Sequence, residues 1–87
     1  MWIITQKRVM INSDLIKVIK ANKVTKRSGN NVFYVRAYDH EYNYIETLAE
    51  TNTEEDASEI MRRIAVEISK SKDSYFQIPS NLETYVS

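Results

Sequence analysis

The clearest hydrophobic pattern in the chain lies between residues 53 and 72, where apolar side chains recur at the spacing of an α-helix. The apolar positions, which follow one another at alternating intervals of three and one, are Ala57, Ile60, Met61, Ile64, Ala65 and Ile68. This spacing places them on one stripe of a helix with 3.6 residues per turn. Thr53 can cap the first turn, and Asp56 stands at the return position of a capping box. The pattern predicts an amphipathic helix over residues 53–72.

Before this helix the pattern alternates with a period of two, which is typical of β-strands. In a strand over residues 32–38, Phe33, Val35 and Ala37 share one face, and the residues between them share the other. Turn-forming residues precede this strand and follow it, and a second strand begins after them. Residues 32–50 are therefore predicted to form a hairpin.

A second hairpin is predicted at the N-terminus from the apolar segments Trp2–Thr5 and Val9–Ile11. As the second residue of a predicted strand, Trp2 is expected to be a core anchor, and truncation of such a buried side chain to alanine would cost about 3–5 kcal/mol. Met10 and Met61 are also expected in the core.

Residues 13–24 fit two patterns. As a helix, Leu15, Ile16, Val18 and Ile19 would share an arc, and Ser13 would cap it. As a strand, the β-branched side chains in the same stretch would be at home, although their alternation is imperfect. The pattern of residues leaves both interpretations open.

The length and composition indicate one globular domain. The chain has 87 residues, of which 43% are hydrophobic and 28% charged, as in ordinary globular proteins. It has no cysteine, which excludes disulfides, thiolate catalysis and cysteine-ligated zinc. No apolar run approaches the ~20 residues of a membrane span, so we expect a cytoplasmic protein without membrane association.

Two stretches resemble a group of small uncharacterised proteins of Gram-positive bacteria, their phages and their integrative elements. The first is Met1–Gln6 with the strand that follows it, and the second is Leu48–Ala57, in which Thr-Glu-Glu leads into the helix. The resemblance implies several antiparallel strands followed by one helix across the sheet, and it favours a strand over residues 14–24. It implies no activity. Ala49 stands where glycine is common in that group, and residues 73–87 extend past its usual end.

These patterns together predict an α+β fold. We expect an antiparallel sheet of four or five strands within residues 1–50, with one C-terminal amphipathic helix packed across one face. The domain is expected to cover residues 1–72, and residues 73–87 form a C-terminal extension. Because the extension carries apolar residues, it can pack on its own sheet, exchange with a neighbouring copy or bind a partner.

The charges are divided unevenly between the two halves of the chain. The net charge is zero, but residues 1–36 contain eight basic residues and one acid, whereas residues 37–87 contain eleven acids and four basic residues. Such a division, +7 against −7, is a hint of charged partners.

Catalytic machinery is not evident in the sequence. The single histidine, His40, lies between Asp39 and Glu41, which suggests either a general base flanked by carboxylates or a metal site. Three consecutive polar residues converge poorly on one ion, so we interpret them as a solvated turn. One glycine cannot build a phosphate-binding loop. We therefore predict a protein that is not an enzyme and has no cofactor, no metal and no small-molecule substrate.

Two kinds of partner remain. Exposed tyrosines suit a protein interface, so another protein or a second copy of the chain is the leading prediction. The residues proposed for it are Tyr34, Arg36, Tyr38, Tyr44, Tyr75 and Phe76. The alternative is single-stranded nucleic acid, bound by a basic sheet face with aromatic platforms. The residues proposed for that role, in addition to the tyrosines, are Lys17, Lys20, Lys23, Lys26, Arg27 and Arg36.

Overall fold

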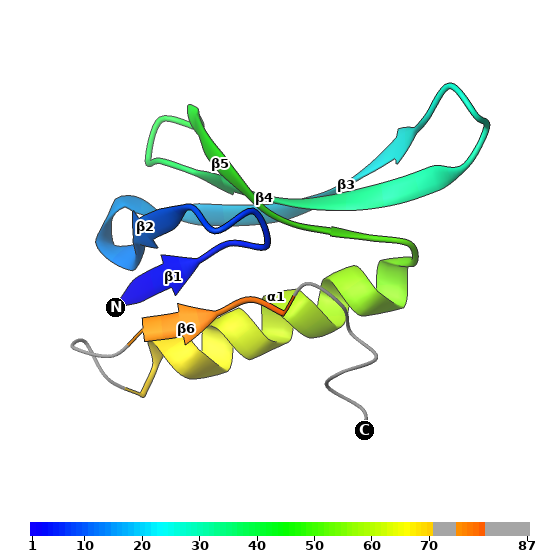
Figure 1. Cartoon of the computed structure of the whole chain (residues 1–87). Helices are drawn as coiled ribbons and strands as arrows, with labels where there is room; N and C mark the ends of the chain where they lie inside the picture. The colour runs from blue at the N-terminus through cyan, green and yellow to red at the C-terminus, as the bar shows by residue number, and fades with distance from the viewer. Residues whose placement is uncertain (71–74, 80–87) are drawn as a thin grey trace.

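The computed structural model describes residues 1–70 and 75–79, and its elements form two small sheets and one α-helix (Figure 1). In chain order they are β1 (Trp2–Ile4), β2 (Met10–Asn12), the 3₁₀-helix η1 (Ser13–Leu15), β3 (Val18–Thr25), β4 (Asn31–Tyr38), β5 (Tyr44–Thr51), α1 (Glu54–Ile68) and β6 (Tyr75–Gln77). The predicted α+β class is confirmed. The sheet differs from the prediction, because the described strands form two three-stranded sheets and the helix is followed by β6.

The larger sheet is an antiparallel meander in the order β3-β4-β5. Its second half is the predicted hairpin over residues 32–50, which is confirmed. Val35 and Ala37 are completely buried on the face that packs on the helix, as their alternation predicted. The register of β4 against β5 shifts between Val35 and Arg36 and again between Ala37 and Tyr38. Such irregularities bend a strand and increase the local twist of the sheet.

Residues 13–24 form one 3₁₀ turn followed by a strand, so the longer helix capped by Ser13 that their pattern also allowed is not formed. Asn12 caps the short helix η1, since its side-chain oxygen accepts a hydrogen bond from the Asp14 N–H at 3.0 Å. The helix lasts one turn, and Ile16 returns the backbone to an extended conformation. Every residue of β3, from Val18 to Thr25, has a register partner in β4. The strand interpretation therefore holds from Val18 onward.

The smaller sheet has the order β2-β1-β6. The predicted N-terminal hairpin of β1 and β2 is confirmed. β6 pairs with β1 in parallel, which the prediction of a purely antiparallel sheet missed. Ile3, Ile11 and Ile78 are buried, and Phe76 packs against them. In the view of Figure 1, β2 is drawn level with the larger sheet and β6 level with α1, with β1 between them.

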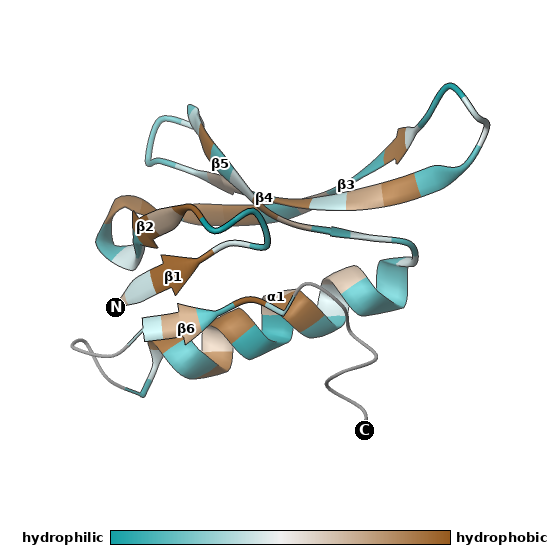
Figure 2. Cartoon of the chain, viewed as in Figure 1, coloured by the Kyte–Doolittle hydropathy of each residue, from teal (hydrophilic) through white to brown (hydrophobic). Residues whose placement is uncertain are grey.

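The helix packs against all three strands of the larger sheet. Thr53 caps it as predicted, because the Thr53 Oγ1 accepts a hydrogen bond from the Asp56 N–H at 3.1 Å. Ala57, Ile60 and Ile64 are its buried residues, and Figure 2 shows hydrophobic segments alternating with hydrophilic ones along the helix. The helix ends at Ile68 rather than at residue 72. In the described part of the chain no helix is long and apolar enough to cross a membrane.

One glutamine joins the two sheets. The Gln6 N–H donates a hydrogen bond to the Leu48 carbonyl oxygen at 3.2 Å, and the Gln6 Oε1 accepts one from the Glu50 N–H at 2.8 Å. The Gln6 Nε2 donates a third bond to the Pro79 carbonyl oxygen at 3.0 Å. These bonds place the turn after β1 against the outer edge of β5, and they bring the residues after β6 to the same junction.

Candidate functional site

The predicted tyrosine-bearing surface exists on the larger sheet, on the face opposite α1. Because Val35 and Ala37 face the core, Tyr34, Arg36 and Tyr38 lie on the other face of β4. Tyr44 joins them from β5, where it is the register partner of Tyr38. The two rings meet edge to face, with centroids 6.3 Å apart. Four of the six residues proposed for protein binding are therefore brought together.

Two basic side chains of the domain already contact the tyrosine rings on this tyrosine-bearing face. The Arg36 guanidinium carbon lies 4.9 Å from the centroid of the Tyr34 ring, and the Lys20 Nζ lies 5.8 Å from the centroid of Tyr38. Both distances are within the range of cation–π attraction. Tyr34, Arg36 and Tyr38 are all half-buried. A ligand at this face would compete with these contacts for the two tyrosine rings.

The basic residues proposed for nucleic-acid binding are not gathered on one face. Lys20 is the register partner of Arg36 and lies on the tyrosine-bearing face, whereas Lys23 is the partner of Phe33 and lies on the opposite face. Lys26 forms an ion pair with Glu50, with 3.2 Å between Nζ and Oε2. Of the remaining two, Lys17 precedes β3 and Arg27 follows it, and both are exposed. The sequence left this division open, because residues 13–24 also fitted a helix, and only on a strand does a lysine at every third residue change face each time.

The smaller sheet presents a second surface, which is not among those predicted from the sequence. Trp2 is the register partner of Asn12 on one side and of Tyr75 on the other, and Ile4 is the partner of Met10. Partners in a ladder share a face. Trp2, Ile4, Met10 and Tyr75 therefore lie together on the side away from the core, and we refer to these four side chains as the outer face.

The outer face is exposed and apolar. The exposed fractions are 45% for Trp2, 57% for Met10 and 68% for Tyr75. The prediction that Trp2 and Met10 belong to the core was therefore wrong. Short strands alternate their side chains between two faces, and here Ile3 and Ile11 take the inner positions. The available signal was the run Trp2-Ile3-Ile4, in which apolar neighbours must point to opposite sides.

The two aromatic residues of the extension that were proposed for protein binding have different environments. Tyr75 belongs to the outer face, whereas Phe76 is half-buried and packs against the core, so it offers little surface to a partner. The neighbouring Ile78 is completely buried, so the structure places this part of the extension on the body of the domain. The rest of the predicted extension, residues 73–74 and 80–87, lies outside the described residues.

The residues around His40 form an exposed turn. The Asp39 Oδ1 accepts hydrogen bonds from the Glu41 N–H at 2.8 Å and from the Asn43 N–H at 2.9 Å. The bond from the Asn43 backbone is the main reason why the pKa of Asp39 is lowered. The His40 Nε2 lies 3.4 Å from a Glu41 oxygen, and both side chains are mostly exposed. Across residues 1–70 and 75–79, no group of three or more His, Cys, Asp or Glu side chains could hold a metal ion.

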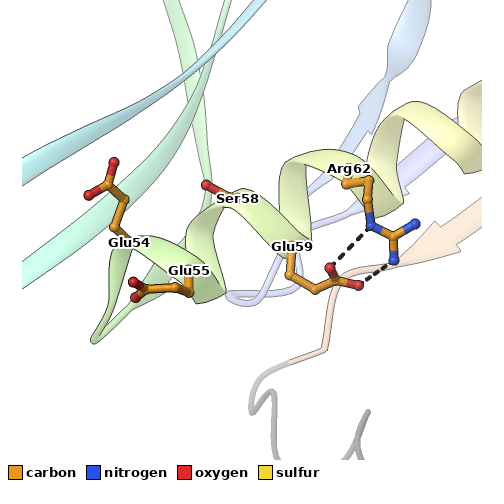
Figure 3. Close-up of a pocket in the computed structure, with 5 residues that line it drawn as sticks. All are labelled: Glu54, Glu55, Ser58, Glu59 and Arg62. Carbon is orange, nitrogen blue, oxygen red and sulfur yellow. Dashed lines mark hydrogen bonds and ion pairs between the residues drawn. The ribbon is translucent and has the colours of Figure 1, made fainter.

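Two hollows on the described surface have the shape of possible ligand sites. The larger, of about 450 Å³, follows one flank of the helix and is lined by Glu54, Glu55, Ser58, Glu59 and Arg62 (Figure 3). Arg62 hydrogen-bonds Glu59, which lowers the pKa of Glu59. The smaller, of about 70 Å³, lies between Gln6 and β5 and is well below the size of a typical ligand pocket.

Comparison with known proteins adds no identity to this geometry. No family model, no curated protein and no solved structure matches the chain.

Proposed function

We propose that this domain is a non-enzymatic protein-interaction module that binds another protein through the outer face of its smaller sheet. The observation that carries the proposal is the alignment of Trp2, Met10 and Tyr75 as exposed side chains on one face. Tryptophan, tyrosine and methionine are enriched at protein interfaces, and tryptophan and tyrosine provide many of the energetic hot spots. A cytoplasmic location is part of the proposal, and a phage or mobile-element origin rests on the resemblance of sequence alone.

The size of the outer face favours a different protein over a second copy of the chain. Its three exposed side chains present on the order of 400 Å². A stable complex buries about 800 Å² on each partner. Two copies meeting at this face alone would therefore associate weakly, whereas a partner that also contacts the surrounding surface can bury enough area.

The tyrosine-bearing face supports a second candidate, single-stranded nucleic acid. The favourable observation is the pairing of cations with rings, Lys20 with Tyr38 and Arg36 with Tyr34, since base stacking and phosphate contacts use the same residue types. We rank it second because Lys26 is neutralised by Glu50, and because Glu50 is itself the register partner of Tyr34.

The test of the leading proposal compares proteins captured by the intact chain with those captured by a W2S/Y75S double variant. Tyr42→Ser is the matched control, because Tyr42 is also an exposed tyrosine but lies in the turn between β4 and β5. We expect a partner that the intact chain and Y42S retain and the double variant loses. Binding of the purified partner should also shift the emission of Trp2, the single tryptophan, to shorter wavelength. Identical captured proteins for all three chains would contradict the proposal.

A further inference from the structure

The lysines of β3 follow a period of three. Lys17, Lys20, Lys23 and Lys26 are evenly spaced along the strand and its ends, and residues 15–38 contain no acid. A strand has a side-chain period of two, so consecutive lysines of this series point to opposite faces. Lys20 and Lys26 lie on the tyrosine-bearing face, and Lys23 lies on the other. A ligand that covers one face of the sheet can meet only half of the series, whereas a strand added at the edge has side chains on both faces and can meet all of it.

The two edges of the larger sheet differ. Gln6 covers the edge of β5 through its bonds at Leu48 and Glu50. β3 is the opposite edge, and within residues 1–70 and 75–79 its only sheet partner is β4. Edge strands present unpaired backbone groups that can bind another chain.

The phase of the β3–β4 ladder shows which backbone groups of β3 point outward. The Lys26 N–H donates to the Asn30 carbonyl oxygen at 2.8 Å, so these two residues form a hydrogen-bonded pair. Such pairs alternate along an antiparallel ladder. Lys20, Asn22 and Val24 therefore direct their backbone groups toward β4. The N–H and C=O groups of Ile19, Ala21 and Lys23 point to the open edge, where the side chains of Ala21 and Lys23 are exposed.

We propose that the edge of β3 accepts an extended acidic segment of another protein as a fourth strand, with acidic side chains three residues apart. The inference rests on the proposed function and specifies the chemistry of a partner. Backbone hydrogen bonds would provide the attachment, as in other cases of strand addition. The lysines at every third position would favour a segment with acidic side chains on both of its faces. Pairing of β3 with β3 of a second copy is disfavoured, because it can place lysines beside lysines, and like charges across a ladder are destabilising.

The probe is a labelled peptide of eight residues, the length of β3, with the sequence acetyl-Thr-Val-Glu-Val-Thr-Glu-Val-Thr-amide. Its binding to the full chain is followed by fluorescence anisotropy at low salt. The control peptide carries lysine at the two glutamate positions. We expect the acidic peptide to bind at least tenfold more tightly than the basic one. We also expect it to shift the backbone amide resonances of Ile19, Ala21 and Lys23 more than those of β5.

Two pairs of variants test the geometry. Ala21→Pro removes an outward N–H and is tolerated in the fold, because proline is accepted on edge strands where the N–H faces solvent, whereas Ala21→Val keeps the N–H. Lys23→Glu reverses a charge of the series, and Lys7→Glu reverses one in the turn after β1. We expect A21P and K23E to weaken peptide binding at least tenfold and A21V and K7E to leave it nearly unchanged. Equal affinity for the acidic and basic peptides, or undiminished binding by a folded A21P, would overturn the inference. A partner that depends on Trp2 and Tyr75 would then still be captured, so the two proposals fail separately.

Discussion

The Glu50 backbone N–H donates a hydrogen bond to the side chain of Gln6 at 2.8 Å, although 44 residues separate the two in the chain. The same side chain donates to the Pro79 carbonyl oxygen. One amide thus connects the turn after β1, the edge of β5 and the segment after β6. It also closes one edge of the larger sheet, and the opposite edge at β3 has no comparable cover in the described part of the chain.

Gln6→Leu should destabilise the domain, because the Glu50 N–H and the Pro79 carbonyl oxygen each lose a protein partner. We expect a loss of about 1–2 kcal/mol in the free energy of unfolding, since each bond contributes about 0.5–1.5 kcal/mol net. Urea denaturation followed by circular dichroism measures it. Lys7→Leu, at the adjacent exposed position, should change the free energy by less than about 0.5 kcal/mol. Equal stability of Q6L and the unmodified chain would show that water replaces both bonds without cost.

The two neighbours Trp2 and Ile3 should respond in opposite ways to truncation. Ile3→Ala removes a completely buried side chain and should cost about 2–5 kcal/mol. Trp2→Ser should cost about 1 kcal/mol or less, because nearly half of the Trp2 side chain is already exposed. Thermal unfolding of both variants under the same conditions measures the difference. A larger loss for W2S than for I3A would show that Trp2 belongs to the core after all.

Asp39 should make the domain sensitive to acid. Its pKa is lowered from the ordinary 3.8, chiefly because the Asn43 backbone N–H donates to the carboxylate. A folded-state pKa below the unfolded value means that ionised Asp39 stabilises the fold above the unfolded pKa. This contribution is lost as the pH falls through the folded pKa. Between about pH 5 and pH 2, Asp39→Asn should therefore lose less stability than the unmodified chain. Urea midpoints at both ends of this range measure the effect, and parallel losses in the two chains would contradict it.

Single-stranded nucleic acid provides a direct test of the second candidate function. Phosphate contacts are strongest at low salt, so a labelled mixed-sequence strand should bind at ~20 mM salt and lose most of its affinity at ~200 mM salt if this candidate is correct. Tyr38→Ser should then weaken binding by about 1–3 kcal/mol through loss of stacking, with Tyr42→Ser as the control. Absence of binding at the lower salt concentration excludes the candidate. We expect this outcome, because the basic residues are divided between two faces.

The parts of the fold that local patterns govern were predictable. The helix was recognised because its apolar stripe and its cap at Thr53 are properties of contiguous residues. The hairpin over residues 32–50 was recognised for the same reason, since alternation and turn residues lie close together in the chain. The sequence also showed that basic residues dominate the first half of the chain and acidic residues the second. It did not show that lysines lie along an open sheet edge, the edge of β3.

The remaining features depend on contacts between distant segments. The pairing of β6 with β1 joins residues more than 70 positions apart, and no local pattern encodes such a register. Residues 18–24 became a strand because β4 provides a ladder for them, although their own pattern also allowed a helix. The outer face arose in the same way. Trp2 and Ile3 are both apolar, but only one face of the smaller sheet packs against the core. Ile3 lies on that face, so Trp2 is left exposed to solvent.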